Sequence, residues 1–422
     1  MTPAASPLDQ PRGLTSVCSA HPWVIEAALL QALEDGGPAL IEATCNQVNQ
    51  EGGYTGLTPA AFRDQVLTIA ECVGLPRGQV ILGGDHLGPN PWRHLPAPEA
   101  MARAEAMVAA YAEAGYGKIH LDTSMGCAGE AAGLPDEVTA ERAARLAAVA
   151  EAAAKRAGTA PRYVIGTEVP TPGGALEESL HLQVTRPGAA VATYEVHRRA
   201  FASAGAASAF ERVAALVVQP GVEFGHASVV VYQPERARDL SASLRSLPGL
   251  VFEAHSTDYQ PAASLAALVR DGFAILKVGP GLTFAMREAL YAADQIAAVL
   301  RPSDARPLAA VMEEVMLADP THWRSHYRGT PEEQRVLRHY SYSDRIRYYW
   351  PAPAAGQAVE TLLARLEGCR IPETVVSQFL PLLYGRVASG CLPGEARRLV
   401  TETVRDVLRA YAAACRTRSL DA

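Results

Sequence analysis

Polar residues suited to metal and proton chemistry recur directly after short apolar runs. Asp85 and His86 end one run, His255 follows another, and His226 lies just beyond a third. Three histidines on separate strand ends can converge on one point and leave a coordination position open for a substrate oxygen, as catalytic zinc sites require. The alternative is that each histidine is only a polar residue at a strand end. Because three occur together beside carboxylates, we interpret His86, His226 and His255 as ligands of a divalent metal.

Two carboxylates are predicted to move protons at this site. Neighbouring residues on an extended strand point to opposite sides, so Asp85 needs a short turn to face the substrate bound at His86. Placed there, it can act as a general acid or base, and otherwise it orients a histidine. Glu168 ends a further run and is predicted as a second acid/base group or an additional metal ligand, with a structural carboxylate as the alternative.

Other polar residues at the ends of the runs are expected to contact substrate. His94 and His120 lack such company and are interpreted as surface or structural residues. Gly83-Gly84 and Gly279-Pro280-Gly281 allow close backbone approach, which alone is a weak signal for an anion cradle. The predicted substrate-binding residues are Glu42, Asn46, Asp122, Ser124, Asp258 and Lys277.

Eight short apolar runs alternate with longer segments of helical period, which predicts βα units around a parallel sheet. Because the polar residues collect at the carboxyl ends of the runs, where barrel active sites lie, we predict a (β/α)8 barrel. An open doubly wound sheet is the alternative, but no G-x-G-x-x-G motif supports it. The runs are Leu14 to Cys18, Ala39 to Thr44, Gln79 to Asp85, Lys118 to Asp122, Tyr163 to Glu168, Ala214 to Gln219, Leu250 to Ala254 and Phe273 to Val278.

Beyond about Arg301 the strand signals stop and only helical stretches follow, among them Pro331 to His339 and Glu395 to Ala414. We therefore predict a flexible N-terminus (1–13), a barrel (14–300) and a helical C-terminal extension packed on the barrel (301–422). The segment from Tyr340 to Trp350 is the densest aromatic and basic cluster of the extension. It is expected to pack on the barrel, and contact with another subunit or with substrate are the alternatives.

Composition excludes several classes of function. The apolar fraction is 49%, the formal net charge is −7, and no Lys/Arg-rich run occurs, so neither a nucleic acid nor an anionic membrane is an expected partner. No signal peptide or membrane-spanning run is apparent. The seven cysteines lack C-x-x-C spacing and their number is odd, which predicts free thiols and a cytoplasmic protein.

Longer motifs identify a resemblance. The chain resembles the GatZ/KbaZ family in several blocks from His21 to the C-terminal helices. Among these blocks are LGGDHLGPNPW, KIHLDTSMGCAG, VVQPGVEFGH, FEAHSTDYQ, AILKVGPGLTFAMREAL and SDRIRYYWP. The family comprises the Z-type subunits of class II D-tagatose-1,6-bisphosphate aldolase, which are similar in turn to zinc-dependent fructose-bisphosphate aldolases. The resemblance places Asp85 as catalytic acid/base, His86, His226 and His255 as metal ligands, and Glu168 near an additional metal-binding glutamate.

The resemblance also implies cofactor, substrate and partners. We expect a divalent metal, zinc first, with manganese, cobalt or nickel as alternatives because such sites bind all of them. The substrate is expected to be a ketose or ketose phosphate, and the partners a Y-type aldolase subunit and further copies in a homo-oligomer. Metal binding is expected to be lost on replacing His86, His226 or His255 by Ala.

Three functions follow from the resemblance. The first is a Z-type protein of metal-dependent C3–C4 aldol chemistry, the second a tagatose/fructose 4-epimerase, and the third a non-catalytic accessory subunit. The glycine-rich phosphate segment of the aldolases is replaced here by Ser256-Thr257-Asp258-Tyr259, which suggests a differently phosphorylated or unphosphorylated ketose. No G-x-x-x-x-G-K-[ST] motif supports a kinase.

Overall fold

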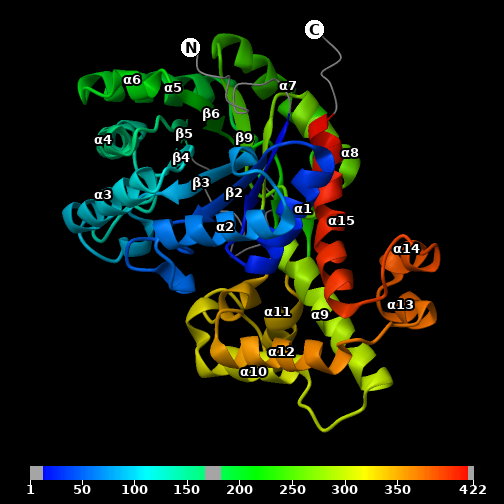
Figure 1. Cartoon of the computed structure of the whole chain (residues 1–422). Coiled ribbons are helices and arrows are strands. Elements are labelled where there is room, and N and C mark those ends of the chain that lie inside the picture. Colours follow the sequence, from blue (N-terminus) through cyan, green and yellow to red (C-terminus); the bar gives the residue numbers. More distant parts are fainter. Residues whose placement is uncertain (1–12, 167–181, 417–422) are drawn as a thin grey trace.

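A computed structural model describes residues 13–166 and 182–416. Eight parallel strands form a closed barrel in the order β1-β10-β9-β6-β5-β4-β3-β2 (Figure 1). The (β/α)8 fold is therefore confirmed. The strands are β1 (Leu14–Cys18), β2 (Ala39–Thr44), β3 (Val80–Leu87), β4 (Lys118–Leu121), β5 (Arg162–Ile165), β6 (Val213–Val217), β9 (Val251–Ala254) and β10 (Ile275–Val278).

The strands form where the sequence is apolar on both sides. Most buried apolar residues join one large core, whereas a separate small cluster is formed by residues of the barrel strands alone. Burial on both faces is what requires the near-continuous apolar runs. The small cluster consists of Leu14, Leu40, Val164, Ala215, Val217 and Ile275.

Helices connect successive strands and cover the outside of the barrel (Figure 1). Left-handed glycines at positions 36, 74 and 158 end α1, α2 and α4, a conformation that costs glycine little. These helices are α1 (Pro22–Asp35), α2 (Pro59–Val73), α3 (Ala97–Glu113), α4 (Asp136–Ala157), α5 (Pro187–Ser203), α6 (Ala207–Phe210), α7 (Pro234–Ser243), α8 (Ala262–Arg270) and α9 (Pro280–Leu300).

Only helices follow α9 in the described part of the chain. In Figure 1, α10, α11 and α12 lie at the lower end of the barrel, and α15 runs back along it beside α8 and α9. The short 3-10 helix η7 (Arg345–Tyr349) contacts α9 and α10. The helices are α10 (Leu308–Ala318), α11 (Pro331–Tyr340), α12 (Pro353–Leu366), α13 (Glu373–Phe379), α14 (Tyr384–Ala388) and α15 (Ala396–Arg416).

One element was not expected from the sequence. A two-stranded antiparallel hairpin, β7 (Glu223–Phe224) with β8 (Val229–Val230), follows β6 outside the barrel and carries His226 in its turn. The expectation of a flexible N-terminus falls on residues outside the described ranges. All seven cysteines are unpaired. Among the described helices, none combines the length and the apolar character needed to cross a bilayer.

Candidate active site

A local irregularity of β3 brings two consecutive residues to the same place. Pairing between β3 and β4 shifts register between Gly84 and Leu87, and His86 has a left-handed φ of 50°. A β-bulge with such a residue redirects side chains that would otherwise alternate, and strained residues of this kind concentrate at functional sites. Asp85 and His86 consequently both face the site, as the predicted acid/base role of Asp85 required.

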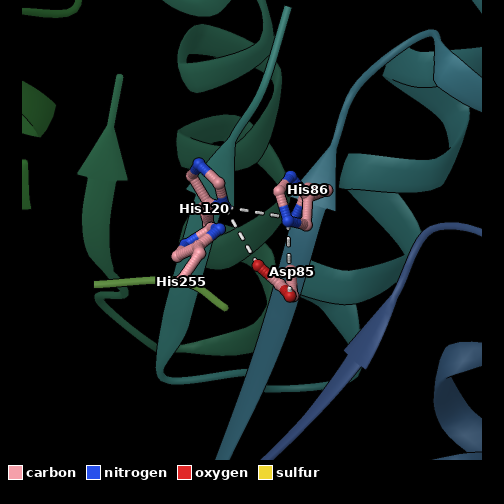
Figure 2. Close-up of side chains that lie close together, drawn as sticks. All are labelled: Asp85, His86, His120 and His255. Carbon is pink, nitrogen blue, oxygen red and sulfur yellow. Dashed lines mark hydrogen bonds and ion pairs between the residues drawn. The ribbon is translucent and has the colours of Figure 1, made fainter. Parts of the chain in front are cut away.

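Asp85 and three histidines lie close together at the carboxyl ends of the strands. One ligand atom from each of Asp85, His86, His120 and His255 falls within 4.8 Å of all the others. The four side chains point toward one another in Figure 2, and the ring centroids of His86 lie 4.9 Å from His120 and 4.8 Å from His255. We call these four residues the histidine cluster.

Two histidines of the cluster offer a nitrogen to a ligand. Nδ1 of His255 is buried without a hydrogen-bond partner, and Nε2 of His86 lies 3.8 Å from Asp85 Oδ2 but makes no hydrogen bond to any residue in the described ranges. Burial opposes it, but Asp85 and Asp122 raise the pKa of His86 when no metal is bound. His120 differs, because its Nδ1 accepts from the His86 backbone N–H and lies 3.0 Å from Asp85, while its Nε2 lies 3.0 Å from the Gly166 carbonyl. His120 therefore supports the site, and His86 and His255 are its open nitrogens.

In each of these two histidines, a carboxylate contacts the other ring nitrogen. Nδ1 of His86 lies 2.8 Å from Asp122 Oδ2, and Nε2 of His255 lies 3.0 Å from Glu253 Oε1. Burial lowers the pKa of His255 to about 4 despite the opposing effect of Glu253, so its imidazole is neutral at neutral pH. A neutral imidazole whose far N–H meets a carboxylate is the usual arrangement of a metal-binding histidine.

A buried ionic network lies beside the cluster. Lys118 contacts Glu42 at 2.6 Å and Glu253 at 2.8 Å, and Lys277 contacts Glu42 and Asp85, each at 2.7 Å. Burial opposes ionisation of Asp85, but His86 and Lys277 hold the pKa of this carboxyl well below its usual range. Asp85 is therefore ionised, and one of its oxygens lies 2.7 Å from the Lys277 ammonium.

A cavity of about 160 Å³ opens over the cluster. Asp85, His86 and His255 line it together with the predicted substrate residues Asn46, Asp258 and Lys277. Arg347 and Tyr348 of η7 form another part of the lining, so the C-terminal extension reaches the site. The sequence had made packing on the barrel the first expectation for this segment and substrate contact an alternative.

Several predicted site residues have other surroundings. Glu42 is fully buried in the ionic network, and Asp122 and Ser124 bond to each other behind His86 without lining the cavity. Asp258 lines the cavity, but its Oδ1 accepts the backbone N–H groups of Gly279 and Gly281 at the start of α9. Glu42, Asp122 and Ser124 therefore do not line this cavity, and their contact with substrate stays a prediction.

His226 is separated from the cluster. Its Nδ1 lies 3.2 Å from Ser341 Oγ and 3.3 Å from Ser343 Oγ, and its Nε2 lies 3.2 Å from the His326 carbonyl. The expectation that His86, His226 and His255 converge is therefore met only for His86 and His255 in this structure, because the hairpin turn carries His226 toward the extension. Glu168 lies outside the described residues.

The donor set fits a divalent metal ion. The unpartnered buried Nδ1 of His255, the open Nε2 of His86 and the adjacent carboxylate of Asp85 are the nitrogen and oxygen donors that zinc and similar ions take. A buried nitrogen that bound neither a metal ion nor a hydrogen-bond partner would lower the stability of the fold.

The fold and the site define a (β/α)8 barrel with a histidine–carboxylate centre at the carboxyl ends of its strands. Residues 4–416 match the family described as D-tagatose-1,6-bisphosphate aldolase subunit GatZ/KbaZ-like, and the chain belongs to this family. The resemblance found from the sequence motifs is thereby confirmed.

Two relatives cover nearly the whole chain. A protein of Agrobacterium fabrum (strain C58 / ATCC 33970) named D-tagatose 6-phosphate 4-epimerase is 55% identical over 413 residues, which are 97% of this chain and 96% of the relative. A crystal structure from Sinorhizobium meliloti 1021, described as a probable tagatose 6 phosphate kinase, is 58% identical and superimposes with a TM-score of 0.90, covering 96% of this chain and all of that one.

Proposed function

We propose that this protein is a divalent-metal-dependent 4-epimerase of a ketohexose 6-phosphate, working by cleavage and re-formation of the C3–C4 bond. The observation that carries the proposal is the histidine cluster, with two open imidazole nitrogens beside an ionised Asp85. The relative named D-tagatose 6-phosphate 4-epimerase supports both the substrate and the reaction.

Asp85 is the proposed proton acceptor. It takes the proton of the C4 hydroxyl as the C3–C4 bond breaks, C4 becomes an aldehyde carbon, and the bonding electrons pass to C3 and the C2 carbonyl. After the aldehyde turns over, C3 attacks its other face and Asp85 returns the proton to the C4 oxygen. His86 and His255 would hold the metal, with Glu168 as a further ligand proposed from the sequence. A bound ion would supply stabilisation of the negative charge that develops on the substrate oxygens.

The surroundings of the site favour one phosphate over two. Helix N-termini in barrels are common phosphate sites. Here the carboxylate of Asp258 already accepts the N–H groups of Gly279 and Gly281, so the start of α9 carries an internal anion. This supports a monophosphate substrate over the bisphosphate of an aldolase.

Two alternatives remain candidates. Aldolase activity requires only that the aldehyde leaves before it rejoins, and an accessory role is suggested by the family description, which names a subunit. A kinase needs a nucleotide-phosphate loop, and the sequence offers none.

The test is an NMR assay of the purified protein with metal on tagatose and fructose, their 6-phosphates and their 1,6-bisphosphates, in D2O. We expect the two 6-phosphates to interconvert without deuterium at C3 or C4, since both C–H bonds survive the reaction. Asp85→Asn should lower turnover by about 100- to 10,000-fold, and the exposed Asp239→Asn on α7 is the matched control.

Other outcomes select the alternatives. Trioses released from a bisphosphate would identify an aldolase. Activity that appears only after a Y-type subunit is added would establish the accessory role and remove the case for catalysis by Asp85.

A further inference from the structure

The cavity over the histidine cluster is too small for the proposed substrate by itself. Its volume is about 160 Å³, whereas pockets for small ligands usually measure about 300 Å³ or more. A second cavity of about 370 Å³ adjoins it, and the two share the lining residues Cys18, Gln47, Tyr54, Gly279 and Arg347. None of the cluster residues lines the second cavity. If the sugar of a ketohexose phosphate is held at the cluster, its phosphate end must therefore extend past these shared residues into the second cavity.

Among the shared residues, Arg347 is the cation. No carboxylate within the described ranges forms an ion pair with it, in contrast to Lys277, which contacts Glu42 and Asp85. Its Nη1 donates to the backbone carbonyls of Ser343 and Asp344, and its Nη2 donates to the Tyr348 hydroxyl at 3.1 Å. Of the five N–H donors of a guanidinium, the Nε–H and one Nη2–H are left for a ligand.

The neighbours of Arg347 fix its position. The guanidinium lies over the Tyr348 ring, 4.5 Å from the centroid, and His322 stacks on the same ring at 4.7 Å. Arg345 also lies over this ring, at 5.1 Å, and likewise forms no ion pair in the described chain. A planar, preorganised guanidinium loses little freedom on binding, which suits bidentate recognition of a phosphate.

Two guanidinium groups act on the Tyr348 hydroxyl. Burial alone would raise the pKa of Tyr348, but Arg347 and Arg345 outweigh burial and lower it. An anion entering this part of the cavity meets the guanidinium of Arg347, while the start of α9 nearby is occupied by Asp258.

We propose that Arg347 of the C-terminal extension binds the terminal phosphate of the substrate and sets the preference for a phosphorylated ketose over a free one. The identity of the sugar in this inference rests on the proposed function, whereas the anion site itself is argued from the geometry of η7. The extension thus contributes a specificity-determining residue to a reaction performed in the barrel.

The experiment compares wild type with Arg347→Gln and Arg347→Lys, using D-tagatose 6-phosphate, D-tagatose and inorganic phosphate. Arg328→Gln, an exposed arginine of the extension that lines neither cavity, is the matched control. Loss of the guanidinium should lower kcat/KM for the 6-phosphate by about 10- to 100-fold, because a charge-assisted bond is lost. The value for the free sugar should stay within about 3-fold, since no such bond is involved. For Arg347→Lys, kcat/KM for the 6-phosphate should lie between the values of wild type and Arg347→Gln, because lysine keeps the positive charge but lacks the paired N–H donors of a guanidinium.

Binding measurements keep the test independent of catalysis. Calorimetry with inorganic phosphate and with the 6-phosphate should show weaker binding to Arg347→Gln at unchanged metal content and melting temperature. If wild type turns over neither sugar, the proposed function fails, and these binding data still decide the role of Arg347. Equal losses for phosphorylated and free sugar, or unchanged phosphate binding, would overturn the inference.

Discussion

The protein holds positive charge in two different ways in two regions. In the barrel, Lys118 and Lys277 each contact two or more carboxylates. In the extension, Arg345 and Arg347 are held by carbonyl oxygens and aromatic rings instead. The barrel lysines and carboxylates offset one another's charge around Asp85, whereas neither arginine forms an ion pair in the described ranges and Arg347 has two N–H groups left for a ligand. The comparison supports the proposal that the barrel performs the chemistry and the extension recognises the substrate.

The largest effect that tests this division concerns the metal. His255→Ala removes an open nitrogen of the histidine cluster, so it should lose the bound ion and lower turnover by roughly 1000-fold or more, since a metal contributes several kcal/mol. Metal content by mass spectrometry checks this, with the exposed His94→Ala as control.

His226→Ala sharpens the same test. Because both ring nitrogens of His226 contact the extension, this variant should keep most of its metal. A loss equal to that of His255→Ala would instead show that His226 moves into the cluster when metal binds, as the sequence predicted.

The second effect is on stability. Lys118→Met removes one of the two ammonium groups that both Glu42 and Glu253 contact in the interior, and breaking a buried pair in this way costs about 3–5 kcal/mol. A markedly lower melting temperature is expected, with the exposed Lys155→Met of α4 as control. Equal melting temperatures of Lys118→Met and Lys155→Met would mean that the ion pairs of Lys118 do not stabilise the barrel.

The smallest effect is a pH dependence in the extension. Burial raises the pKa of Asp344 to about 7, and its Oδ1 has no hydrogen-bond partner. The native state therefore binds this proton more tightly than the unfolded state, so the contribution of Asp344 to stability falls as pH rises from about 4 to about 7.

Asp344→Asn removes this titration, and asparagine tolerates the left-handed φ of 46° at this position. The melting temperature of the variant minus that of wild type should therefore be larger at pH 8 than at pH 5. Parallel melting curves across this range would show that Asp344 stays ionised in the native state.

The fold was largely predictable because its cause is local. Strands buried on both faces are mostly apolar, and the predicted bounds of β1 and β2 equal those observed. The hairpin β7–β8 was missed because strands of two residues carry almost no periodicity.

The site was predictable in part for a similar reason. Asp85, His86 and His255 stand at or near strand ends. His120 was interpreted as a surface or structural residue, and Glu253, within β9, was not considered. Alternation was the available signal, since Lys118, His120 and Asp122 are polar at every second position of a buried strand. The displacement of His226 depends on tertiary contacts with Ser341 and Ser343, which no local pattern encodes.

The last helix has a consequence for the order in which the protein is made. Tyr411 of α15 donates its hydroxyl to the Thr257 carbonyl at 2.6 Å, and the Thr257 hydroxyl donates to the Lys277 carbonyl at 2.6 Å. Because synthesis runs from the N-terminus, residue 257 is made well before residue 411. The loop that follows His255 thus lacks the hydrogen bond from Tyr411 until α15 has been made, and a chain interrupted before α15 contains Asp85 and His255 but not this contact.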